Sequence, residues 1–209
     1  MKVLLVNSSP HEKGSTYTAL STVADILEAE GIGTEIFWLG MKPVSGCMSC
    51  RRCAETGRCA ISDKVNEFLD LAETADGFVF GSPVHYAAAC GTATSFMDRA
   101  FFAGTKKNSP FYLKPAAAVA AARRAGTTSA LDQMNKYFVI SGMPVVPSSY
   151  WPMVFGTGEK KVLEDLEGLQ IMRDLGRNMA FLLKCKAAGL QAGVPLPARE
   201  DKIFTNFVR

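Results

Sequence analysis

The sequence has 209 residues, of which 48% are hydrophobic and 21% are charged. This composition excludes a disordered chain, and we expect residues 1–209 to form a single domain with a full-sized core. The net charge of +3 does not indicate a nucleic-acid partner. No apolar run is long enough to span a bilayer, so no membrane association is expected. Because no cleavable signal peptide is evident, we expect a cytoplasmic protein whose cysteines stay reduced.

Apolar segments typical of buried strands alternate with segments of helical periodicity along the chain. Strands are expected at 2–7, 33–39, 76–84, 116–122 and within 144–155. Helices are expected before Gly31, from Asp63, near 96–101, near 131–138 and over 159–187. This alternation predicts an α/β fold with a doubly wound five-stranded parallel sheet of order 2-1-3-4-5 and helices on both faces. No Gly-x-Gly-x-x-Gly turn follows the first strand, which argues against the dinucleotide-binding version of this architecture.

Three loops are predicted to form the ligand site of this sheet. Ligands of doubly wound sheets bind beyond the carboxyl ends of the strands, which points to loops 8–16, 82–91 and 122–128. The first loop, NSSPHEKGST, supplies hydroxyl groups and precedes a helix N-terminus, so it favours a phosphate. The alternative is that Ser15 or Thr16 only caps the helix. No Walker motif is present, which disfavours a nucleoside triphosphate.

Four of the six cysteines lie in the segment GCMSCRRCAETGRCAISD, at Cys47, Cys50, Cys53 and Cys59. Reducing conditions disfavour a disulfide, and zinc sites usually combine two Cys-x2-Cys pairs that are separated by a longer stretch. The run Cys-x2-Cys-x2-Cys resembles the ligand pattern of bacterial ferredoxins. A [4Fe–4S] cluster and ordinary loop thiols therefore both stay open at this point. Cys90 and Cys185 lie outside the motif and are expected to be buried.

A family resemblance connects these segments. NSSPHEKGST (7–16), GSPVHYAAACGTATSFMDR (81–99) and AARRAG (121–126) resemble the cofactor loops of the NAD(P)H-dependent FMN reductase family, whose fold is flavodoxin-like. With CMSCRRCAETGRC (47–59) between the second strand and the second helix, the chain is most similar to the iron–sulfur flavoproteins of that family. Two departures are that His85 stands where the family often has an aromatic residue, and that Ala87–Ala89 replace small polar and glycine residues.

The resemblance implies a set of binding residues. The FMN phosphate and ribityl chain would be held by Ser9, His11, Gly14, Ser15 and Thr16. The isoalloxazine ring would be lined by Pro83, Val84, His85 and Tyr86, and its other side closed by Arg123, Arg124, Gly126 and Thr127. At the family's spacing, a [4Fe–4S] cluster in the loop 46–62 becomes the favoured interpretation, with Cys47, Cys50, Cys53 and Cys59 as ligands. Arg51, Arg52 and Arg58 would offset its negative charge.

The function that the resemblance implies is electron transfer between FMN and the cluster, with NAD(P)H or a reduced ferredoxin as donor. The acceptor could be a quinone, an oxygen species or another protein. The alternatives are an FMN reductase without the cluster, and a redox-sensing or zinc-stabilised binding module. Family members form dimers or tetramers in which the cluster of one subunit faces the flavin of its neighbour. A homodimer or homotetramer is therefore expected. A second apolar face on the helix of the C-terminal region (158–209), with Ile171, Phe181 and Leu182, would suit it, although one broad core-facing stripe explains these residues equally well.

Overall fold

A parallel sheet forms the centre of the molecule. The computed structural model describes residues 1–104, 109–201, 203–205 and 207. The strands of the main sheet follow the order β2-β1-β3-β5-β6, and all neighbours on this path are parallel. Their bounds are Lys2–Asn7 for β1, Gly33–Trp38 for β2, Gly77–His85 for β3, Ala116–Ala122 for β5 and Met153–Phe155 for β6. A further strand, β4 (Ala88–Ala89), pairs antiparallel with the end of β3.

The expectation of five strands in the order 2-1-3-4-5 therefore needs correction, because the sheet has six strands and β4 was missed. Strand β4 contains only two residues, which pair with Val84 and His85 at the end of β3. A strand this short has no readable alternation of apolar and polar residues. The class of fold, a parallel sheet covered by helices on both faces, is confirmed.

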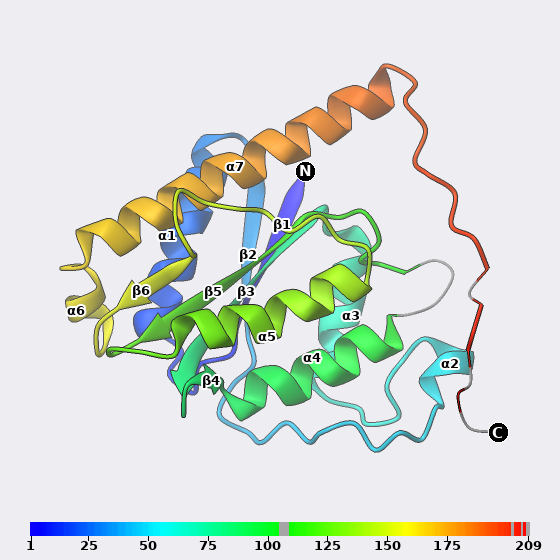
Figure 1. Cartoon of the computed structure of the whole chain (residues 1–209), viewed down its shortest axis with the longest axis horizontal. Coiled ribbons are helices and arrows are strands. Elements are labelled where there is room, and N and C mark those ends of the chain that lie inside the picture. The colour runs from blue at the N-terminus through cyan, green and yellow to red at the C-terminus, as the bar shows by residue number, and fades with distance from the viewer. Residues whose placement is uncertain (105–108, 202, 206, 208–209) are drawn as a thin grey trace.

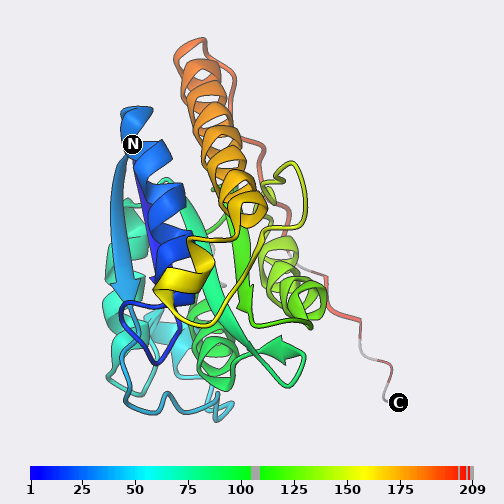
Figure 2. The same cartoon turned by 90° about the vertical axis from the view of Figure 1, so that its left-hand side faces the viewer.

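Helices cover the two faces of the sheet, as Figures 1 and 2 show. Helices α1 (Ser15–Ala29) and α7 (Leu166–Gln191) pack together on one face, and α3 (Lys64–Thr74), α4 (Gly91–Ala103) and α5 (Thr127–Ile140) cover the other. Helices α2 (Cys53–Thr56) and α6 (Glu159–Val162) are single turns. None of the described helices combines the length and apolar character needed to cross a membrane.

Alternation along the strands divides the core into two halves. Leu4 and Val6 of β1 pack with α3, α4 and α5, whereas Val3 and Leu5 pack with α1 and α7. Successive side chains of a strand point to opposite faces, so a strand covered on both faces must be apolar at every position. Strand β5 follows this rule throughout its sequence AAAVAAA, and every one of its residues is buried.

The C-terminal third differs from the expectation in two places. The segment 144–155 pairs with β5 only at Val145 and over β6, because Pro144, Pro147 and Pro152 between and beside these points have no N–H to donate. The helix expected over 159–187 is broken into α6 and α7. Asp165 causes a new start, since its Oδ1 accepts the N–H of Gly168 at 2.9 Å and caps α7.

Candidate functional site

The three predicted cofactor loops lie side by side at one edge of the sheet. They follow the carboxyl ends of β1, β3 and β5, which are neighbours in the sheet. In Figure 1 this edge is the lower one, where β4 also lies. The topology therefore brings together the residues expected to bind FMN, although they come from three separate parts of the chain.

The first loop is held in shape by Asn7, the last residue of β1. Its buried side chain accepts the N–H of Ser9 through Oδ1 at 3.0 Å and donates to the carbonyl of Glu12 through Nδ2 at 3.0 Å. The Ser9 hydroxyl in turn accepts the N–H of His11 at 3.1 Å. Ser9 is buried and His11 is exposed. Asn7 was missed in the sequence, where its signal is an amide side chain directly at the end of a buried strand.

The start of α1 is open to an anion. Gly14 is the N-cap and no side chain caps the helix, so the alternative that Ser15 or Thr16 caps it is wrong. The Ser15 hydroxyl instead donates to the carbonyl of Gly156 at 3.1 Å and accepts the N–H of Gly158 at 3.0 Å. Thr16 is buried. A helix N-terminus without a side-chain acceptor presents backbone N–H groups and the positive end of the helix dipole, which suits a phosphate.

The second loop is a tight hairpin between β3 and β4. Tyr86 and Ala87 form its turn with φ angles of 49° and 58°, the left-handed region that glycine usually occupies in such turns. Non-glycine residues in this region store strain that the surrounding structure must offset. Pro83 and Val84 are half-buried, whereas the side chains of His85, the last residue of β3, and Tyr86 are exposed.

The third loop contacts the hairpin. Gly126 has φ of 88° and precedes α5. A Cβ added there would lie 2.5 Å from Ala87 Cα and 2.9 Å from Val84 Cγ1. Arg123 and Arg124 are exposed at the end of β5. The side chain of Thr127 is buried, with its hydroxyl 3.1 Å from Met153 Sδ, so only its backbone is available to a ligand of this edge.

The four clustered cysteines face a common space. Cys47, Cys50, Cys53 and Cys59 all line one small cavity of about 20 Å³. Burial raises the pKa of the Cys53 thiol, and its neighbours Cys59, Cys47 and Cys50 raise it further. Yet no three His, Cys, Asp or Glu side chains among the described residues converge closely enough to hold one metal ion. These findings agree if the thiols surround a space without meeting at one point.

Arg99 from α4 reaches this cavity and was not predicted to do so. The residue is only 2% exposed. Its Nε and Nη2 each lie 3.2 Å from Cys59 Sγ, and the guanidinium also donates to both carboxylate oxygens of Asp63, at 2.7 and 2.8 Å. Burial lowers the pKa of Arg99, but the hydrogen bonds to Asp63 and Cys59 outweigh it, so the pKa is raised overall.

Of the three arginines that were expected to offset the charge of a cluster, Arg51 also lines the cysteine cavity. Arg51 and Arg52 are exposed, and the guanidinium of Arg58 pairs with the carboxylate of Asp70. That hydrogen bond raises the pKa of Arg58 and lowers the pKa of Asp70. Asn66 fixes the neighbouring backbone instead. Its Oδ1 accepts the N–H of Cys59 at 2.9 Å, and its Nδ2 donates to the carbonyl of Cys59 at 3.0 Å.

The two remaining cysteines differ in their exposure to solvent. Cys90 is buried as expected, with Sγ 3.5 Å from the Ser8 hydroxyl, so it connects the first two cofactor loops. Cys185 is exposed on α7, and the expectation that it is buried is wrong.

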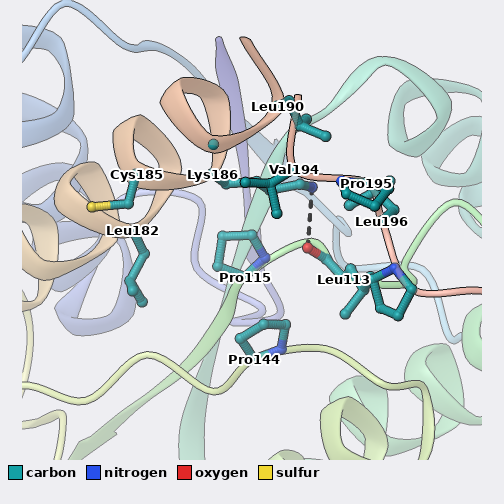
Figure 3. A pocket seen from close by; sticks show the side chains of 12 residues that line it. Leu113, Pro115, Pro144, Leu182, Cys185, Lys186, Leu190, Val194, Pro195 and Leu196 are labelled. Carbon is teal, nitrogen blue, oxygen red and sulfur yellow. Dashed lines mark hydrogen bonds between the residues drawn. The ribbon is translucent and has the colours of Figure 1, made fainter. Parts of the chain in front are cut away.

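An apolar cavity of about 450 Å³ lies away from these sites. Figure 3 shows its lining by α7, the segment that follows α7, and the residues that precede β5. Its polar group is Lys186, whose Nζ donates to the carbonyl of Leu113 at 3.1 Å and whose pKa is lowered by burial. Pro115, at the amino end of β5, is part of the wall, so this cavity lies at the opposite end of that strand from the cofactor loops.

A doubly wound parallel sheet with these loops at the carboxyl edge of its strands defines a flavodoxin-like protein. Solved structures of this fold agree. The match to RosB with its bound intermediate 8-demethyl-8-formylriboflavin-5'-phosphate covers 100% of this chain and 94% of RosB, at a TM-score of 0.70 and 16% identity. The match to an archaeal flavodoxin covers 88% of this chain and 99% of the flavodoxin chain, at a TM-score of 0.59 and 16% identity.

Sequence comparison gives the family. Residues 1–158 match the family described as NADPH-dependent FMN reductase. The chain is also 32% identical over 196 residues to an iron-sulfur flavoprotein of Methanocaldococcus jannaschii, covering 88% of this chain and 98% of the relative. An iron-sulfur flavoprotein of Archaeoglobus fulgidus is 27% identical over 99 residues, 47% of this chain and 48% of its own. This chain therefore belongs to the NADPH-dependent FMN reductase family, and it is an FMN-binding oxidoreductase of flavodoxin-like fold.

Proposed function

We propose that this oxidoreductase passes electrons between FMN and a [4Fe–4S] cluster whose ligands are Cys47, Cys50, Cys53 and Cys59. The observation that carries the proposal is that all four thiols line one cavity together with the buried guanidinium of Arg99. A cubane spreads its four thiolate ligands farther apart than one ion does, which suits thiols that surround a space. Because the cavity is small, the exposed loop that bears Cys47 and Cys50 must move outward to admit the cluster.

The carboxyl edge of strands β1, β3 and β5 offers a place for FMN. The N–H groups at the start of α1, with Ser9, His11, Gly14, Ser15 and Thr16, would hold the phosphate and ribityl chain. Since the Ser15 hydroxyl is engaged by Gly156 and Gly158, Ser15 would contribute its backbone N–H. The hairpin Pro83–Tyr86 would line the ring, and Arg123, Arg124, Gly126 and Thr127 would close its other side, Thr127 through its backbone.

FMN supplies both two-electron and one-electron transfer, and the cluster supplies one-electron transfer. The chain has to bind and orient these groups. The buried Asn7 fixes the first loop, and the contact of Gly126 with Ala87 fixes the second loop against the third. The exposed side chains of His85 and Tyr86 leave the outer side of the hairpin accessible. This accessibility supports an external donor, NAD(P)H or a reduced ferredoxin, and a quinone, oxygen species or protein as acceptor.

A homodimer or homotetramer is part of the proposal. Of the three residues expected on a second face of the C-terminal helix, Ile171 is buried in the core, Leu182 is half-buried, and Phe181 is exposed. The support therefore comes from Phe181 and from Ile203 and Phe204 in the segment after α7, whose side chains are 66%, 94% and 85% exposed. Light scattering on the loaded protein tests it, and a monomer of 22.5 kDa is the contradicting result.

Anaerobic purification followed by absorption spectroscopy and metal analysis tests the electron-transfer proposal. The expected result is FMN, released by heat and identified by chromatography, together with matching iron and acid-labile sulfide. FMN without iron would favour an FMN reductase that lacks the cluster, zinc would favour a binding module, and FAD would contradict the flavin assignment. Cys47→Ser should remove most of the iron. Cys185→Ser, an equally exposed thiol outside the cavity, is the matched control and should retain it.

A further inference from the structure

We propose that Arg99 is a positioning residue of the cysteine cavity, which holds Cys59 in place and sets the reduction potential of the cluster through hydrogen bonds to its sulfur. This inference rests on the proposed function. Arg99 lies on α4, outside the cysteine motif.

The Arg99 guanidinium donates hydrogen bonds to backbone carbonyls at both ends of the cysteine segment. Nη1 donates to the carbonyl of Ser45 at 3.4 Å and Nη2 donates to the carbonyl of Ile61 at 3.2 Å. Ser45 precedes the first clustered cysteine and Ile61 follows the last one. A single buried side chain therefore ties together both ends of the segment that carries the four thiols.

Arg99 is paired with one carboxylate and also faces a sulfur atom. A guanidinium that is only 2% exposed requires compensation, and Asp63 provides one carboxylate. That carboxylate also caps α3 by accepting the N–H of Val65 at 3.1 Å. The other side of the fork, Nε with Nη2, is directed at Cys59 Sγ, where it would donate two charge-assisted hydrogen bonds to a ligand sulfur.

Cys59 is held more firmly than Cys47 and Cys50. Asn66 bonds its N–H and its carbonyl, and Arg99 bonds its sulfur. By contrast, Cys47 and Cys50 are exposed in a segment without regular structure, beside the left-handed residues Ser49 and Arg51. We infer that Cys59 is the fixed ligand and that the exposed part of the segment adjusts to it.

The expected consequence is electrostatic. Reduction adds one electron and one negative charge to the cluster, and two donors with a positive charge at a ligand sulfur stabilise that added charge. Arg99→Gln removes the charge and the two-pronged donor. The reduced state should become about tenfold less favoured, which corresponds to a potential more negative by about 59 mV for a one-electron couple. Arg99→Lys, which keeps the charge without the planar fork, should show a smaller shift.

The experiment is an anaerobic redox titration of the loaded protein, followed by electron paramagnetic resonance, with flavin and iron contents measured on the same samples. Arg58→Gln is the matched control, because it removes an equal charge beside Cys59 from a guanidinium that pairs with Asp70 instead of the sulfur. Its potential should stay at the wild-type value. An equal shift in Arg58→Gln and Arg99→Gln would reduce the effect to net charge and overturn the inference.

The other possible outcomes also either support or contradict the inference. Loss of iron from Arg99→Gln with FMN retained supports the positioning role. Unchanged iron and potential in both Arg99 variants overturn it, and so does unfolding of both, which would leave Arg99 a purely structural role. If Arg99→Gln alone unfolds, Arg99→Lys is judged by the same criteria. Absence of a cluster from the wild-type protein is a different result, because it contradicts the proposed function itself.

Discussion

Gly126 lies directly against Ala87, so the loop after β5 packs against the turn of the β3–β4 hairpin. A Cβ at Gly126 would stand 2.5 Å from Ala87 Cα, and the φ of 88° adds strain for any other residue. Two of the three predicted flavin-binding loops therefore form one packed unit. A substitution that moves the backbone of one loop should also displace the other.

Gly126→Ala is expected to lower the free energy of unfolding by about 2–3 kcal/mol, because it combines left-handed strain with a steric clash. It should also weaken FMN binding. The matched control is Gly31→Ala, at a φ of 77° with nothing within 4 Å of the added Cβ. That variant should lose about 1 kcal/mol and bind FMN normally. Urea denaturation and flavin fluorescence measure both effects, and equal losses in the two variants would contradict the contact.

Tyr86 and Ala87 give a second test, since both adopt φ angles near 50–60° in the same turn. Replacing either by glycine should relieve strain and raise the free energy of unfolding of the apoprotein by about 1 kcal/mol. Only Tyr86→Gly should weaken FMN binding, because it removes an aromatic ring proposed to line the flavin. Thermal denaturation and flavin titration separate the two readouts. Equal FMN affinity in both glycine variants would show that the Tyr86 ring does not contact the flavin.

Asn7 and Asn66 play similar roles at two separate proposed sites. Asn7 fixes the first cofactor loop, and Asn66 fixes the backbone of Cys59. Asn7→Ala should weaken FMN binding by about 1–2 kcal/mol, since the loop N–H and carbonyl lose their partners, and should leave the iron content unchanged. Asn66→Ala should lower iron retention and leave FMN affinity unchanged. Both contents are measured on each purified variant, and a loss of both groups in either variant would show general destabilisation instead.

Thr16 tests the phosphate site. Its Cγ2 packs close to Gly81, so Thr16→Val keeps the packing and removes only the hydroxyl. FMN binding should weaken by about 1–2 kcal/mol through loss of a hydrogen bond to a charged group. The control is Thr22→Val on the same helix, where the hydroxyl donates to the carbonyl of Thr18 within the helix. Unchanged FMN affinity in Thr16→Val would remove Thr16 from the phosphate site.

The sequence was sufficient for much of the fold because buried parallel strands are apolar at every position. The segment 2–7 was expected as a strand, and β1 spans the same residues. The position of the three loops at one edge of the sheet follows from the βαβ connections, because the connected strands are parallel. The break between α6 and α7 was not predictable from periodicity, since it depends on the side chain of Asp165, which bonds both Gly168 and the end of β6.

Parts of the candidate site could not be predicted from the sequence for a similar reason. The left-handed turn at Tyr86 contains neither glycine nor asparagine, the residues from which such a turn is normally predicted. Arg99 lies far along the chain from the cysteines, and its contact with Cys59 exists only because α4 packs against the segment before α3. Local sequence could place the thiols on one segment, but the charge that faces them comes from tertiary structure.

Helix α4 begins at Gly91, just after strand β4 of the β3–β4 hairpin, and carries Arg99 eight residues later. At a rise of 1.5 Å per residue these points are about 12 Å apart along a rigid rod. The helix therefore sets a fixed spacing between the β3–β4 hairpin, where we propose that the flavin ring binds, and the proposed cluster site. One inserted residue between Gly91 and Arg99 would turn the guanidinium about 100° away from Cys59, whereas a substitution would keep the phase. Relatives that use both groups should vary in sequence over this stretch but not in length.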